Sequence, residues 1–112
     1  MPRGRGRGRM LGSMNDPRSK LFLAFANDQR IKIIQELQKG ERSSPELIKL
    51  LQLDPSVVSR HLSLMRNVGI INARKEGVVL YFSLADNRVV KILDLSTQIT
   101  KDWYMKFQDF FN

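Results

Sequence analysis

A run of short polar and basic side chains lies between positions 56 and 67. It consists of Ser56, Ser59, Arg60, Ser63 and Asn67. At 100° per residue on a helix, these side chains gather on the arc opposite Val58, Leu62 and Met65. Hydroxyl, amide and guanidinium groups on one helix face suit base edges and phosphates in a major groove. This face has the chemistry of a nucleic-acid reader, with an ordinary solvated surface as the alternative.

Two more bases, Arg74 and Lys75, stand beside an expected turn at Glu76-Gly77. At the tip of a hairpin they would either contact phosphates or keep an exposed turn soluble. Contact is favoured because a hairpin that directly follows a groove-binding helix stands beside it in space. We therefore expect this hairpin to be a second DNA anchor.

The groups needed for enzyme and metal chemistry are largely missing. The chain has no cysteine, and its one histidine is His61. This residue lies at the edge of the apolar arc, so we expect a packed or hydrogen-bonded ring rather than a ligand or a catalytic base. No folded segment carries a glycine-rich phosphate loop. We predict no catalytic residues, no metal site, no cofactor and no enzyme activity.

Capping residues and prolines mark the helices that must position these groups. Helix starts are expected at Asp16-Pro17, Asn27-Asp28, Ser44-Pro45 and Asp54-Pro55. The apolar periodicity then predicts helices over about 17–26, 28–39, 45–52 and 55–68. In the first of them Leu21, Phe22 and Phe25 should face inward. The tight turn at Leu53-Asp54 between the third and fourth helices is typical of a helix-turn-helix.

The pattern changes after Gly69, where residues 70–84 become rich in β-branched and aromatic side chains and predict a hairpin. A final helix is expected from Asn87 to Phe111, with Ser96 as a polar residue interrupting its apolar stripe. Its apolar stripe consists of Val89, Ile92, Ile99, Trp103, Phe107 and Phe110. A domain of this size cannot easily bury so long a stripe, so we expect it, with Phe22, to contact a second copy. The fold class is α+β and mainly helical: a winged helix-turn-helix of about five helices, with the hairpin between the fourth and fifth.

Half of the formal net charge of +8 comes from residues 1–14, which contain four arginines alternating with glycines and no acid. We expect this stretch to be disordered. It is either an arm that contacts nucleic-acid phosphates or a leader added by cloning, with Gly12-Ser13 as a scar before Met14. The leader is the working interpretation, and residues 15–112 are taken as one domain with a C-terminal dimerisation helix. With no membrane span or signal sequence apparent, we expect a cytoplasmic location and no membrane partner.

Several segments together resemble the ArsR family of winged-helix repressors. They are residues 24–34, 46–51, 56–62 with Met65, Gly69 and Ile70, and 75–77 with 81–84. The segment from Ser56 to Leu62 is similar to the family pattern s-t-V-S-r-H-L. The resemblance implies a homodimer, built on the first and last helices, that binds an imperfect palindrome near a promoter and releases it when a signal arrives.

The departures from the family concern its metal sites. Ser43 and Pro45 stand where metal-sensing members have a cysteine pair, and neither is a thiolate ligand. On the last helix Asp94 and Asp102 lack the histidines of the other family site. We therefore predict a homodimeric repressor of double-stranded DNA that does not respond to metals and whose effector is unknown. The alternative is a protein-interaction module, because residues 41–83 carry a net charge of only +2.

Overall fold

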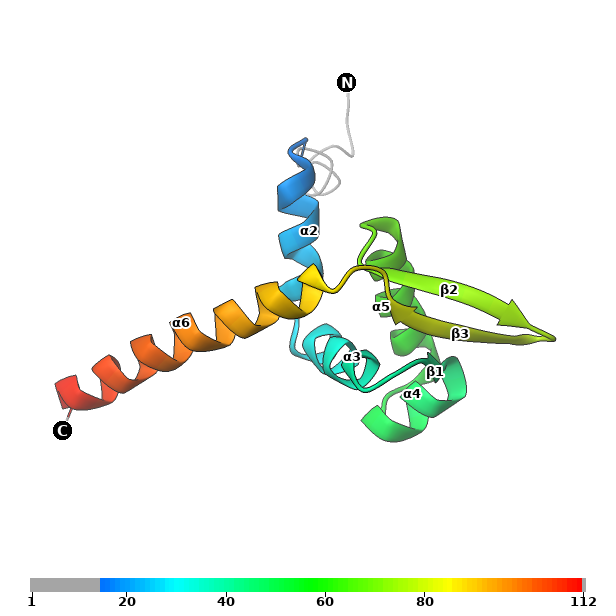
Figure 1. The fold of residues 1–112 in the computed structure, drawn as a ribbon. Coiled ribbons are helices and arrows are strands. Elements are labelled where there is room, and N and C mark those ends of the chain that lie inside the picture. Colours follow the sequence, from blue (N-terminus) through cyan, green and yellow to red (C-terminus); the bar gives the residue numbers. More distant parts are fainter. Residues whose placement is uncertain (1–14, 112) are drawn as a thin grey trace, which may run out of the picture.

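The computed structural model describes residues 15–111, with side chains described as far as Gln108. In chain order the elements are α2 (Pro17–Phe25), α3 (Asp28–Gln38), β1 (Arg42–Ser43), α4 (Ser44–Leu51), α5 (Pro55–Asn67), β2 (Ile71–Glu76), β3 (Val79–Leu84) and α6 (Arg88–Phe111). Helices α3, α4 and α5 form a body with the sheet, and the β2–β3 hairpin extends from it (Figure 1). Helices α2 and α6 project away from that body in two other directions. The predicted fold class, a mainly helical winged helix-turn-helix, is confirmed.

Side-chain caps begin three of the helices where the sequence predicts them, within one residue. The Asp16 carboxylate accepts from the Arg18 N–H at 2.9 Å, and the Asn27 side chain accepts from the N–H groups that open α3. Helix α4 has a capping box, in which Ser43 Oγ accepts from Glu46 N–H and the Glu46 carboxylate accepts from Ser43 N–H. The cap is therefore Ser43, one residue before the predicted Ser44.

The core lies where α3 and α5 meet the sheet. The predicted inner face of α5 is confirmed, since Val58, Leu62 and Met65 are all buried. Phe22 of α2, predicted to face inward, is instead 59% exposed, and Ala24 is the buried residue of that helix. The other buried apolar side chains are Ile33, Ile34, Leu37, Leu47, Ile70, Ile71, Phe82, Val89 and Leu93.

The sheet has three antiparallel strands in the order β1-β3-β2. Glu76 pairs with Val79, so the hairpin turns at Gly77-Val78, one residue later than predicted. Gly77 has a φ of 63°, which a glycine adopts without strain. The two-residue strand β1 was not predicted, and it pairs Arg42 and Ser43 with the second strand of the hairpin.

Helix α6 leaves the body after its first two turns. It is one continuous helix, and Ser96, the polar residue within the predicted apolar stripe, donates its Oγ–H to the Ile92 carbonyl at 2.8 Å. Val89 and Leu93 anchor the helix in the core, whereas every described side chain from Asp94 onward is exposed. The radius of gyration is 16.7 Å, compared with about 13 Å for a compact chain of this length. Within the described part of the chain, no helix has the length and apolarity needed to cross a membrane.

Candidate nucleic-acid interface

The polar face of α5 is open to solvent along its whole length. All five residues singled out in the sequence, namely Ser56, Ser59, Arg60, Ser63 and Asn67, are exposed on this helix. The turn from α4 into α5 passes through Gln52, which has the left-handed φ of 54°. That turn sets the angle between the two helices and leaves the α5 face uncovered by α4. The face is therefore available to a major groove.

A polar contact on its inner side holds α5 against α3. The Arg30 guanidinium donates to His61 Nδ1 at 3.1 Å, and His61 Nε2 donates to the Gln29 side-chain oxygen at 2.7 Å. The expectation of a hydrogen-bonded histidine is confirmed. Burial, and secondarily the charges of Arg30 and Arg60, lower the pKa of His61, so the neutral ring is favoured. This role of Arg30 was not predicted, although its position three residues before the buried Ile33 places a charge on an apolar helix face.

The wing is fastened to the body by Arg74. Its Nε and Nη2 donate to both carboxylate oxygens of Glu41 at 2.8 and 2.7 Å, a bidentate pair. The guanidinium also lies 4.6 Å from the centre of the Tyr81 ring and 3.7 Å from the Glu76 carboxylate. Hydrogen bonding to Arg74 lowers the pKa of Glu41, so this carboxylate stays charged. Glu41 was not predicted, because no local signal marks a residue 33 positions from its partner.

The two basic wing residues therefore differ in their surroundings. Strand alternation turns Lys75 to the opposite face of the hairpin from Arg74. Lys75 is exposed, and no carboxylate pairs with it among the described side chains. The wing tip itself is apolar, because Val78 is 95% exposed at the turn. Lys75 is thus the wing cation that is open to a phosphate.

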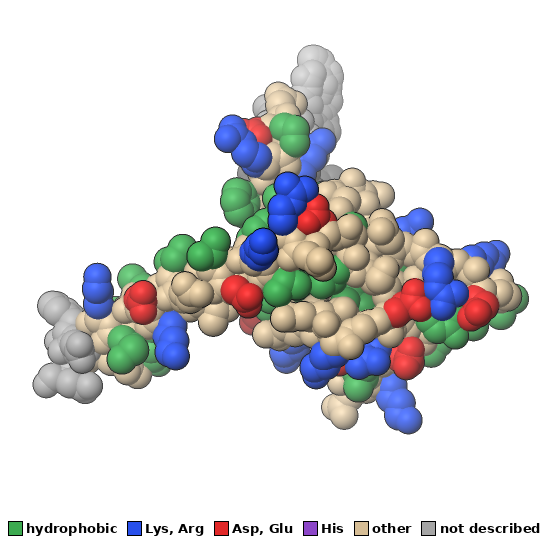
Figure 2. Space-filling model, viewed as in Figure 1, with side chains coloured by type: hydrophobic (Ala, Val, Ile, Leu, Met, Phe, Trp, Pro, Cys, Tyr) green, Lys and Arg blue, Asp and Glu red, His purple; other side chains and the backbone are tan. Residues whose placement is uncertain are grey.

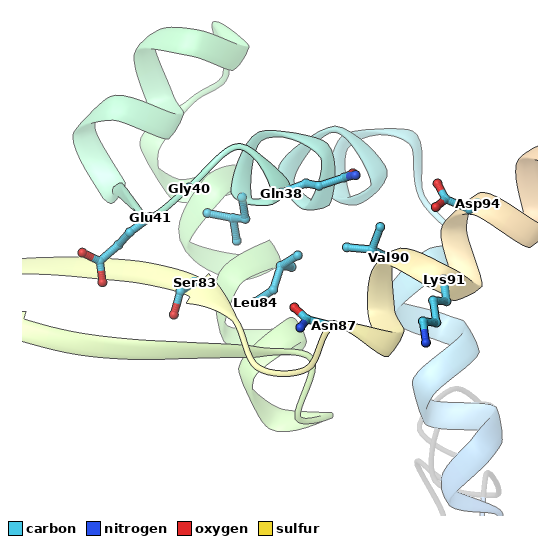
Figure 3. Close-up of a pocket in the computed structure, with 10 residues that line it drawn as sticks. Gln38, Gly40, Glu41, Ser83, Leu84, Asn87, Val90, Lys91 and Asp94 are labelled. Carbon is cyan, nitrogen blue, oxygen red and sulfur yellow. The ribbon is translucent and has the colours of Figure 1, made fainter.

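A pocket of about 580 Å³ lies behind the wing, between the end of α3, the end of β3 and the start of α6. Figure 3 shows Glu41 at one side of it, Leu84 and Val90 near its centre, and Asp94 on α6 at the far side. The lining therefore includes the carboxylate that holds the wing. Asp94, considered above as a weak metal ligand, is part of this lining. Among the described residues, no three histidine, aspartate or glutamate side chains come together as a metal site.

Exposed apolar side chains also lie along α2 and the outer part of α6, among charged ones (Figure 2). Of the residues predicted to meet a second copy, Phe22, Ile99, Trp103 and Phe107 are largely exposed and Ile92 is half-buried. Val89 is 4% exposed and packs inside its own protomer, which corrects its assignment to an interface. The side chain of Phe110 lies outside the described part. Leu95 and Tyr104, which the sequence analysis did not name, are also exposed on α6.

Comparison with known proteins supports what this geometry indicates. An α5 with an exposed polar face, placed beside a basic wing, defines a winged helix-turn-helix DNA-binding protein. Residues 27–73 match the family model "Bacterial regulatory protein, arsR family", from the start of α3 into the wing. The chain belongs to the ArsR family, whose members are transcriptional regulators and not enzymes.

Three relatives illustrate the match. The chain is 32% identical over 87 residues to a probable mercury resistance operon repressor of Streptomyces lividans, covering 78% of this chain and 70% of that protein. It is 35% identical over 75 residues to the transcriptional activator HlyU of Vibrio cholerae, covering 67% of this chain and 69% of that protein. The HlyU structure superposes with a TM-score of 0.67 at 31% identity, over 74% of this chain and 90% of that one. At 23% identity, a homodimeric winged helix-turn-helix domain from Mycobacterium bovis shows the same fold, with a TM-score of 0.70 over 94% of this chain and 92% of that one.

Proposed function

We propose that this protein is a homodimeric transcriptional repressor that binds a palindromic operator, with α5 in the major groove and the wing on the adjacent backbone. The observation that carries the proposal is the wholly polar, solvent-exposed face of α5 beside an unpaired wing lysine. A two-fold dimer would present two such helices to half-sites about one helical turn apart, roughly 34–36 Å.

Within this proposal the recognition residues have different tasks. Arg60 is the one base among the five residues predicted to form this face, and a guanidinium pairs well with guanine. The short side chains of Ser56, Ser59, Ser63 and Asn67 let the helix approach the groove closely and hydrogen-bond to bases or phosphates. Lys75 contacts phosphate. Arg74 is paired with Glu41 and keeps the wing in place. It can reach DNA only with the guanidinium N–H groups that do not donate to Glu41.

The dimer is supported by the apolar surface of α6 and α2, which nothing covers within the described protomer. The hydroxyls of Ser96 and Thr100 lie inside the apolar stripe, and both donate to carbonyls of their own helix. They therefore present small, satisfied groups between Ile92 and Trp103, which allows the backbone of another helix to approach closely. A second copy of the same chain, offering the same stripe across a two-fold axis, suits this surface.

The remaining parts of the proposal concern regulation and context. Release of DNA does not depend on a metal, because Ser43 and Pro45 cannot act as thiolates and Asp94 and Asp102 are oxygen ligands only. Residues 15–112 act as one regulatory unit, residues 1–14 lie outside it, and the protein works in the cytoplasm. No effector is assigned.

Sequencing of the genomic fragments that the purified protein retains, followed by footprinting, tests this function. We expect two protected half-sites about one turn apart. Arg60→Ala should lower discrimination between sequences by roughly 1–3 kcal/mol, whereas Lys75→Ala should weaken binding to all duplexes and flatten the salt slope. Lys101→Ala removes the same charge from an exposed position on α6 and is the control. Absence of salt-dependent binding to duplex DNA would leave the protein-interaction module as the function.

A further inference from the structure

One buried cation connects three helices. Arg30, on α3, is 8% exposed, and its guanidinium donates to the Leu23 carbonyl at 2.9 Å and to the Ala24 carbonyl at 3.1 Å. Both carbonyls belong to the last turn of α2, and the Leu23 carbonyl also accepts from the Ala26 N–H that caps the helix. The third acceptor is Nδ1 of His61, on α5, at 3.1 Å. The end of α2 and the middle of α5 are thus attached to the same side chain.

The imidazole uses both of its nitrogens in this contact. Nδ1 must carry a lone pair to accept from Arg30, and Nε2 must carry the proton that it donates to Gln29 at 2.7 Å. This arrangement exists only for the neutral ring with its proton on Nε2. A protonated ring has an N–H on both nitrogens and can no longer accept from Arg30.

We propose that His61 is a proton-controlled positioning residue: its neutral form holds α5 in the orientation that binds DNA, and its protonation frees α5 and weakens binding. This proposal rests on the proposed DNA-binding function and adds its regulation by acid. His61 touches no DNA in this scheme, because its two nitrogens point to α3 and not to the exposed face of α5.

The charges around the ring make protonation disruptive. Arg30 faces it from α3, Arg60 lies next to it on α5, and α2 contributes only backbone carbonyls. No carboxylate hydrogen-bonds to Arg30, Gln29 or His61 within the described part of the chain. An imidazolium would therefore face a fixed guanidinium at about hydrogen-bond distance without a compensating anion. The ring must then leave its site or the helix must move. The lowered pKa of His61 agrees with this.

The wild-type protein alone allows a direct test, because His61 is the only histidine of the chain and its NMR signals are unambiguous. The pKa of His61 is measured from these signals in the free protein and in complex with an operator duplex. If protonation weakens DNA binding, reciprocity requires that DNA lower the pKa of His61. An equal or higher pKa in the complex overturns the proposal.

A matched variant tests the consequence for affinity. His61→Gln keeps an acceptor for Arg30 and a donor for Gln29 but does not titrate near neutrality. Between pH 7.5 and 5.5 we expect wild-type affinity to fall. A histidine of ordinary pKa, about 6.5, sets the upper bound at about tenfold per protomer, and the lowered pKa of His61 makes the loss smaller. Over the same pH range, the logarithm of the variant's affinity should fall by less than half as much as that of the wild type. Equal losses refute the switch.

The experiment separates this proposal from the function on which it rests. If neither protein binds any duplex at pH 7.5, the DNA-binding function itself fails. If both bind at pH 7.5 and show the same pH dependence, only the switch fails. Should His61→Gln not fold, the comparison of the two pKa values of the wild-type protein still decides the matter.

Discussion

Replacing Trp103 by alanine should dissociate the proposed dimer, and the structure allows the effect to be estimated. Trp103 is 61% exposed in the protomer, which is about 150 Å² of a large aromatic side chain. If a second copy covers this area, alanine would lose roughly 80 Å² of it beyond what its own methyl group retains. At 25 cal/mol per Å² this is about 2 kcal/mol per side chain. A symmetric dimer loses it twice, about 4 kcal/mol, or about a thousandfold in Kd.

The control for this variant is on the same helix. Met105 is 56% exposed but lies about 200° around α6 from Trp103, on the face away from the apolar stripe. Met105→Ala should leave the dimer unchanged, as measured by sedimentation equilibrium over nanomolar to micromolar concentrations. Phe107→Ala should also weaken the dimer, because the centroid of the Phe107 ring lies 5.4 Å from that of Trp103. A wild-type monomer at micromolar concentration, or equal weakening by Trp103→Ala and Met105→Ala, would refute the reasoning.

Other parts of the structure give smaller but equally specific expectations. Gln52→Gly should raise the free energy of unfolding by about 0.5–1 kcal/mol in urea melts, because the left-handed φ strains any residue with a Cβ. Ser43→Ala should lower it by about 1 kcal/mol through loss of the α4 cap, whereas Ser44→Ala should not. Glu41→Gln should weaken DNA binding and broaden the Tyr81 resonances, because the wing loses its bidentate partner. Zinc, cadmium, nickel or arsenite should change DNA affinity by less than tenfold, and a chelator-reversible larger loss would contradict metal independence.

The helices were predictable because their signals are local. Asp16 and Asn27 cap the helices that follow them, and apolar spacings of three and four marked the buried face of α5 correctly. Errors of one residue arose where two adjacent candidates compete, as at Ser43 and Ser44, or where the turn register decides, as at Gly77. At each of these places two neighbouring residues suit the same position almost equally well. Only the contacts of the folded chain select one of them.

The contacts that hold the candidate site in place could not be predicted in this way. Arg30 and His61 are 31 positions apart, and Arg74 and Glu41 are 33 apart. Arg30 and His61 both lie in segments that resemble the family patterns, but a pattern does not show that two of its residues touch. Each contact forms only when separate elements fold against each other. The exposed face of α5 followed from helix geometry alone, whereas the position of the wing depends on Glu41. The assignment of individual residues to bases and phosphates stays a prediction.

The hydrogen bonds of Arg30 link the two surfaces through which this protein is proposed to act, the apolar surface that includes α2 and the polar face of α5. Helix α2 carries part of the apolar surface offered to a second copy, and α5 carries the face offered to DNA. Apolar packing fixes the distance between such helices but tolerates sliding, because it has no directional preference. The hydrogen bonds of Arg30 are directional, and they join the last turn of α2 to the middle of α5. If the proposed dimer forms through α2, a change in the angle of this helix would therefore reach α5 through the hydrogen bonds of Arg30.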